Sequence, residues 1–207
     1  MKSRMVFESI KNFYVEQQQK YFMTDIRALG WHDQTEYVLR FKIASGIGDL
    51  TGRSILDVGC GTGGLLSFLK GQGVKVRYTG VDFVSSSADA CKVNHLDAHV
   101  VCGNILDTSL SLGAKQFEYV FCLGTLNISE AGFHETFRLM VRRMFELCQI
   151  GVALNFLCDE HMLVPSRYHY EDVDGVRNFC EKELGARVVI ADMTELRCEC
   201  TMFVYRV

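Results

Sequence analysis

A glycine-dense stretch after a short apolar run is the part of the chain best suited to bind a ligand. The run is Ser54–Val58, four glycines follow it between positions 59 and 64, and a helical pattern begins at Leu65. Glycine lets the backbone turn sharply and lets a ligand come close to main-chain N–H groups at a helix start. A second strand-like run ends in Asp82. A carboxylate there can accept hydrogen bonds from both hydroxyls of a ribose, so we expect a nucleoside site at adjacent strand ends.

The glycine spacing alone fits two cofactor classes, because it also satisfies the G-x-G-x-x-G pattern of a dinucleotide site. The longer stretch Asp57-Val58-Gly59-Cys60-Gly61-Thr62-Gly63 resembles the first motif of the class I S-adenosylmethionine-dependent methyltransferases, and Gly80-Val81-Asp82 resembles their second. The acid two residues before the first glycine and the Gly63-Gly64 pair favour the methyltransferase interpretation. The resemblance covers roughly residues 50–130 and says almost nothing about the methyl acceptor.

The resemblance implies S-adenosylmethionine as cofactor and S-adenosylhomocysteine as product. In the family, the residue at the position of Asn104 contacts adenine, and Ile105 would pack on the ring; alternatively, Asn104 only makes a turn. We also consider Arg40, whose planar guanidinium matches the methionyl carboxylate, although a solvated helix charge is the simpler interpretation. The expected cofactor contacts are Asp57, Gly59, Cys60, Gly61, Gly63, Asp82, Phe83, Asn104, Ile105, Leu123, Gly124 and Arg40.

The reacting groups are less well defined than the cofactor site. No residue stands out as a general base, so catalytic residues stay unassigned, and His161 and His169 are interpreted as loop residues. No histidine pair has metal-ligand spacing on a helix, so no metal site is predicted. Gly124-Thr125 lacks the prolines typical of enzymes that methylate nucleobase or glutamine nitrogens, which argues against those acceptors.

We therefore predict methyl transfer to an unidentified small-molecule acceptor. One alternative is a non-catalytic S-adenosylmethionine-binding partner subunit. Another is an NAD(P)-binding oxidoreductase, which would carry a Tyr-x-x-x-Lys motif on the helix after the fourth strand; that motif is not found.

The elements around these motifs alternate between strand and helix, which predicts an α/β fold with a doubly wound, mostly parallel sheet. The resemblance implies seven strands with an antiparallel last strand. The expected strands are 54–58, 74–81, 98–102, 117–123, 151–157, 187–191 and 200–205, and the expected helices are 65–70, 85–94, 130–147 and 173–184.

Residues 1–50 precede the first strand and show apolar residues at helical spacing. We expect an N-terminal helical extension over 1–50 and an S-adenosylmethionine-binding domain over 51–207. Gly30-Trp31 and the residues after it resemble an extension found in a poorly characterised branch of the superfamily, which implies that it folds over the cofactor crevice. Trp31 itself is interpreted either as a hydrophobic plug or as a pocket residue.

Composition narrows the function further. The 207 residues carry a net charge of −3, and no Lys/Arg run exceeds Arg142-Arg143, which argues against nucleic acid as a partner. Nine cysteines, an odd number in a chain of this length, indicate reduced thiols and a cytoplasmic location. Met1–Glu8 does not resemble a secretory signal, and no apolar run is long enough to cross a membrane. The oligomeric state is left open.

Overall fold

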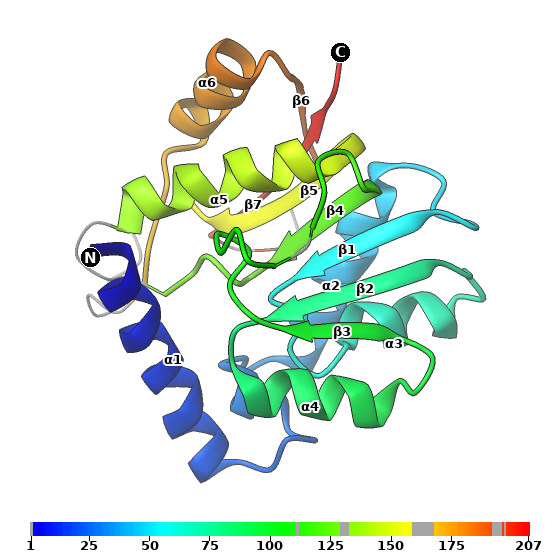
Figure 1. The fold of residues 1–207 in the computed structure, drawn as a ribbon, viewed down its shortest axis with the longest axis vertical. Helices are drawn as coiled ribbons and strands as arrows, with labels where there is room; N and C mark the ends of the chain where they lie inside the picture. Colours follow the sequence, from blue (N-terminus) through cyan, green and yellow to red (C-terminus); the bar gives the residue numbers. More distant parts are fainter. Residues whose placement is uncertain (1, 111, 129–132, 159–167, 192–195, 197) are drawn as a thin grey trace.

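The protein is represented by a computed structural model, which describes residues 2–110, 112–128, 133–158, 168–191, 196 and 198–207. Helical elements cover both faces of a central sheet (Figure 1). They are α1 (Lys2–Lys20), η1 (Ile26–Leu29), α2 (Gln34–Ala44), η2 (Ser45–Ile47), α3 (Gly64–Gly71), α4 (Ser85–Asn94), α5 (Phe133–Leu147) and α6 (Val173–Leu184). None of the described helices is both long and apolar enough to cross a bilayer.

Seven strands form one sheet in the order β3-β2-β1-β4-β5-β7-β6. Their bounds are β1 Ser54–Val58, β2 Arg77–Asp82, β3 His99–Cys102, β4 Phe117–Leu123, β5 Cys148–Leu157, β6 Arg187–Ile190 and β7 Glu199–Tyr205. The five strands from β3 to β5 are parallel, and β7 is antiparallel to both β5 and β6. The predicted fold class is therefore confirmed, including the antiparallel last strand.

Two strands begin three residues away from their predicted starts, for local reasons, and the other strand ends agree to within one residue. The predicted second strand begins at Val74, but the Val74 N–H donates to the Leu69 carbonyl and closes the end of α3, so β2 begins only at Arg77. The fifth strand begins three residues early, because Cys148 already pairs with Phe117 ahead of an irregularity in the ladder. Apolar character alone shows neither the hydrogen bonds that end a helix nor those that extend a strand.

Alternate residues of the central strands enter two separate cores. Leu56 and Val58 of β1 pack into the cluster that includes α5 and α6. Ile55, the residue before Leu56, points to the opposite face and packs into the other cluster with buried residues of α2 and α3. Because both faces of the sheet are buried, the central strands appear in the sequence as continuous apolar runs. This is why the sequence predicts these strands clearly.

The turn after β1 depends on glycine. Gly59, Gly61 and Gly63 all have positive φ, a conformation that favours glycine. The Gly59 N–H donates to the Val81 carbonyl at 2.7 Å, which ties the turn to β2. A Cβ on Gly59 would lie only 1.9 Å from Oγ1 of Thr125, so the turn also requires the absence of a side chain.

Substitution of Gly59 by Ala should therefore lower the free energy of unfolding by more than the strain of a left-handed backbone alone. Gly52→Ala is the matched control, because Gly52 has nearly the same φ (+74° against +73°) and has nothing within 4 Å of an added Cβ. We expect Gly52→Ala to cost about 1–2 kcal/mol from the left-handed backbone. Gly59→Ala should cost roughly 1–3 kcal/mol more from overpacking. Urea unfolding measures the free energy of unfolding of both variants. Equal losses in the two variants would show that a Cβ on Gly59 does not clash with Thr125.

Candidate functional site

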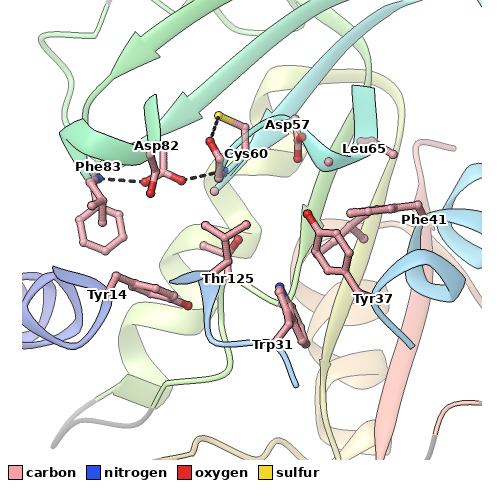
Figure 2. A pocket seen from close by; sticks show the side chains of 18 residues that line it. Tyr14, Trp31, Tyr37, Phe41, Asp57, Cys60, Leu65, Asp82, Phe83 and Thr125 are labelled. Atoms are coloured by element: carbon pink, nitrogen blue, oxygen red, sulfur yellow. Dashed lines mark hydrogen bonds between the residues drawn. The ribbon is translucent and has the colours of Figure 1, made fainter. Parts of the chain in front are cut away.

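A small cavity of about 60 Å³ lies at the carboxyl ends of β1, β2 and β4. This is the place where ligands bind in open α/β sheets. Strand-end and turn residues form one side, and residues of the first fifty form the other (Figure 2). The lining residues are Tyr14, Leu29, Trp31, Tyr37, Phe41, Asp57, Gly59, Cys60, Gly61, Gly64, Leu65, Asp82, Phe83, Val84, Ser87, Leu123, Gly124 and Thr125.

Asp82, the last residue of β2, connects the turn to the next helix. Its Oδ2 accepts the Gly61 N–H and its Oδ1 accepts the Val84 N–H, both at 2.9 Å. Burial raises the pKa of Asp82 to about 6, against the lowering effect of these two hydrogen bonds. Each carboxylate oxygen has two lone pairs, so Asp82 retains acceptor capacity beside the cavity.

Asp57 is a second buried carboxyl group on the same side. Its Oδ2 accepts the Tyr78 hydroxyl at 2.7 Å. Burial raises the pKa of Asp57 to about 7; the Tyr78 hydrogen bond lowers it, and the nearby Asp82 raises it. Two neighbouring carboxyl groups under a glycine turn make this edge of the sheet an acceptor-rich site for hydroxyl or ammonium groups.

Aromatic side chains of the N-terminal residues cover the cavity. Figure 2 shows Tyr14, Trp31 and Tyr37 across the cavity from Asp82 and Asp57. Tyr37 packs edge-on against Phe41 with ring centroids 4.8 Å apart, and the Trp31 and Tyr37 centroids are 6.0 Å apart. Burial raises the pKa of both tyrosines far above the usual value. The cover is therefore neutral at physiological pH.

The predicted cofactor residues divide into two groups. Those along the cavity are Asp57, Gly59, Cys60, Gly61, Asp82, Phe83, Leu123 and Gly124. Gly63, Asn104, Ile105 and Arg40 are not among the lining residues. Gly63 lies at the back of the turn, where an added Cβ would lie 2.4 Å from the His95 ring.

The main-chain N–H groups of the turn are largely used inside the protein. Gly59 and Cys60 both donate to the Val81 carbonyl, Gly61 donates to Asp82, and Gly63 donates to the Cys60 carbonyl. The expectation that these N–H groups cradle a ligand therefore needs correction. In this structure the glycines of the turn allow its conformation and keep side chains out of the cavity.

Asn104 and Ile105 do not meet the expectation of an adenine contact in this structure. Oδ1 of Asn104 accepts the Leu106 N–H at 2.9 Å, which is the turn-forming alternative. Ile105 is 2% exposed and belongs to the core cluster on the α5 side of the sheet. Their position after a strand could not reveal that Asn104 forms a turn and that Ile105 packs into the core.

Arg40 is neither a solvated charge nor a residue of the cavity lining in this structure. The side chain is 4% exposed, so it is not a solvated charge, and its guanidinium forms a two-pronged ion pair with the Glu199 carboxylate. The guanidinium also lies 3.8 Å from the ring centroid of Trp31. Nη1 of Arg40 has no hydrogen-bond partner among the described residues. Arg40 thus packs against the Trp31 ring and links α2 to β7 through Glu199.

Several cavity residues were not predicted as contacts. Tyr14, Tyr37 and Phe41 come from the helical patterns of the N-terminal residues, where spacing identified a buried face but not what it covers. Thr125 entered the sequence prediction only through the absence of prolines at Gly124-Thr125. Its hydroxyl donates to the Val58 carbonyl at 3.0 Å, which locks it under the turn.

The buried Arg40–Glu199 ion pair leads to a prediction about the stability of the protein. Glu199→Ala would leave the buried guanidinium with only the exposed Glu36 carboxylate, 3.9 Å away, and breaking a buried pair costs about 3–5 kcal/mol. Lys70→Ala, which removes the exposed ion pair with Asp97, is the control and should change the free energy of unfolding little. Chemical denaturation measures both variants. A Glu199→Ala protein as stable as the control would show that the pair carries no stabilisation.

Comparisons with known proteins agree with this geometry. Residues 55–145 match a family model described as a methyltransferase domain. A search of curated proteins finds no significant match. Among solved structures, the chain is similar to magnesium protoporphyrin IX methyltransferase from Synechocystis PCC 6803 with bound S-adenosylhomocysteine, at 17% identity and TM-score 0.67 over 99% of both chains.

It is also similar to an S-adenosylmethionine-dependent methyltransferase from Archaeoglobus fulgidus, at 14% identity and TM-score 0.62 over 83% of this chain and 94% of that one. Phosphoethanolamine N-methyltransferase 1 from Haemonchus contortus matches at 14% identity and TM-score 0.68, over 97% of this chain and 49% of that one. Residues 55–145 thus match a methyltransferase domain, and the chain has the Rossmann-like fold of these S-adenosylmethionine-dependent methyltransferases.

Proposed function

We propose that this enzyme transfers a methyl group from S-adenosylmethionine to a small-molecule acceptor, with the cofactor held between the strand ends and residues 1–50. The observation that carries the proposal is the buried Asp82 carboxylate beside a turn in which Gly59 and Gly61 bring no side chains to the cavity. When bound, the cofactor supplies a sulfonium methyl group that a nucleophilic atom of the acceptor can take. The protein then has to orient the two partners and exclude water.

The chain's own residues fit the polar end and the sugar of such a cofactor. Asp82 would accept ribose hydroxyls with its remaining lone pairs, and Asp57 adds a second carboxyl group near the turn. Gly61 and Gly124 lack side chains along the cavity. A Cβ on Gly124 would lie 2.2 Å from Trp31, so the Trp31 ring can lie beside this residue only because it is glycine. Phe83 offers an apolar surface next to Asp82.

The volume supports a moving cover. Pockets for small molecules commonly measure about 300–1,000 Å³, and the cavity measures about 60 Å³. We infer that residues 1–50 form a lid, separate from a cofactor domain over 51–207, and that its aromatic side chains withdraw when the cofactor enters. The aromatic contacts of Trp31, Tyr37 and Tyr14 would then exclude water from the filled site.

A small acceptor is favoured by the same enclosure. Aromatic side chains close the cavity on the side of the lid, which suits a compact organic molecule better than a polymer. Similar structures include enzymes named for magnesium protoporphyrin IX and for phosphoethanolamine, both small molecules. The net charge of −3 argues against nucleic acid, and we retain the cytoplasm as the expected location.

A non-catalytic S-adenosylmethionine-binding subunit is the main competing function. A methyl-transfer screen of cell extract with labelled cofactor distinguishes the two. Label transferred to a small molecule supports an independent enzyme. Tight product binding without any transfer supports the subunit, and clear NADH binding without S-adenosylhomocysteine binding would overturn both.

Substitution of Asp82 by Asn tests the proposed site. Loss of a charged acceptor should weaken S-adenosylhomocysteine binding roughly 10–100-fold, the value of one or two charged hydrogen bonds. Asp89→Asn is the matched control, because Asp89 is an exposed residue of α4 that pairs only with Lys92 among the described residues. Isothermal titration measures the affinities. Equal affinity in wild type and Asp82→Asn would place the ligand elsewhere.

The raised pKa of Asp82 predicts the pH dependence of that binding. Above a pH of about 6 the carboxylate is ionised and accepts hydrogen bonds well; below it the carboxyl group is protonated. Affinity should therefore fall as the pH drops through about 6, and the Asp82→Asn protein should lack this part of the change. The contribution of Asp82 to folding has the opposite sign, because a raised pKa stabilises the protonated folded state and this stabilisation is lost as the pH rises.

Removal of the Trp31 ring tests the lid. Trp31→Ala should speed S-adenosylhomocysteine association, because the ring then no longer has to leave the cavity before the ligand enters. Phe22→Ala is the control, since Phe22 is an N-terminal aromatic residue that is 87% exposed and does not line the cavity. Stopped-flow measurements of ligand binding give the rates. An unchanged association rate in Trp31→Ala would contradict the lid.

A further inference from the structure

A cluster of two imidazoles and a carboxylate lies outside the cofactor cavity. Among the described residues, His134, His169 and Glu171 bring ligand atoms to within 4.8 Å of one another. Nδ1 of His134 and Nε2 of His169 lie 2.7 and 2.6 Å from the same oxygen, Oε1 of Glu171. None of the three lines the cavity of the cofactor. We propose that they form a binding site for a divalent transition-metal ion of the zinc type.

The two residues of the extended segment are held in place by β5 and by the residues after β4. The His169 N–H donates to the Asn127 carbonyl and the Glu171 N–H to the Leu157 carbonyl, both at 2.9 Å. Residues two apart in an extended chain point to the same side, so His169 and Glu171 present their side chains together. His134 comes from the first turn of α5, more than thirty positions earlier in the chain. The site thus joins two segments that are distant in sequence.

Packing fixes the imidazole of His169. Its ring lies edge-on to Phe133, with centroids 4.7 Å apart, and 6.0 Å from the ring of Phe137. The Glu171 side chain is 5% exposed, whereas that of His134 is 55% exposed. Two ligands are therefore ordered before any ion arrives, and the third lies at the surface, where it gives an ion access from solvent.

The ligand set selects the class of ion. Two imidazole nitrogens and one carboxylate oxygen suit zinc and similar first-row ions, whereas magnesium and calcium prefer oxygen ligands. Three protein ligands leave a further position for water. The ligand atoms are already within a few ångströms of one another, so an ion requires only small side-chain shifts to insert between them.

Metal binding would change which ring nitrogens of the two histidines carry protons. Without metal, each imidazole nitrogen that faces Glu171 carries the hydrogen of the bond. To bind the ion, His134 and His169 must present lone pairs at those nitrogens and hold a proton only on the other ring nitrogen. The ion then replaces two hydrogen bonds with three coordinate bonds that clamp the residues before α6 to the start of α5.

The test uses the full chain after treatment with a chelator, titrated with zinc chloride alone and then with cobalt(II) chloride. We expect one ion per chain by elemental analysis and a visible cobalt spectrum without the thiolate charge-transfer band that cysteine ligands would give. His134→Ala and Glu171→Gln should each weaken zinc binding by at least roughly 10–100-fold, the loss seen even when outer-shell partners of a metal site are removed. Neither measurement depends on methyl transfer.

His99→Ala is the matched control, because His99 is an exposed histidine on β3, outside the cluster. It should retain full zinc affinity. His134→Ala removes a half-exposed side chain, and its circular dichroism spectrum checks that the fold is kept. Absence of stoichiometric zinc binding by the wild-type chain, or equal binding by wild type, His134→Ala and Glu171→Gln, would overturn the site and leave the cluster as a hydrogen-bonded contact only.

Discussion

The hydrogen bond from the Gly61 N–H to the Asp82 carboxylate is the contact on which the site depends. It joins the turn after β1 to the end of β2 and keeps the carboxylate at the cavity. Burial of that carboxylate is unfavourable for its charged form, which is why its pKa is raised. A buried carboxyl group with a raised pKa beside a cavity is typical of a functional site.

The cover of the cavity depends on a second buried charge. Arg40 lies between Trp31 and Glu199, so the position of the indole ring is tied to β7, the antiparallel strand of the sheet. The N-terminal residues are thus linked to β7 by this ion pair and also by the Tyr205 hydroxyl, which donates to the Ile47 carbonyl. This connection gives a physical route by which filling of the cavity and the position of α2 depend on each other.

Much of the fold could be predicted because both faces of the sheet are buried. The runs at Ser54–Val58 and Phe117–Leu123 coincide with β1 and β4, and the helix at Val173–Leu184 ends at Gly185 as its sequence indicates. Boundaries were missed where a helix cap or a strand irregularity decides them. The predicted helix start at Glu130 lies outside the described residues, and α5 is described from Phe133.

The site was only partly predictable from sequence, for a different reason. Motif residues such as Asp57 and Asp82 follow from strand ends and lie along the cavity. The buried positions of Arg40 and Ile105 were not predicted, because a local sequence does not reveal a partner 159 positions away or packing in the core. The cluster around Glu171 was missed because its ligands come from separate segments, which spacing rules for one helix cannot detect.

A crystal structure of the full chain with S-adenosylhomocysteine tests the central claim most directly. The account predicts both ribose hydroxyls on the Asp82 carboxylate and the Trp31 ring displaced from its place beside Gly124. A ligand bound elsewhere, or a pyrophosphate-containing cofactor at the glycine turn instead, would contradict it.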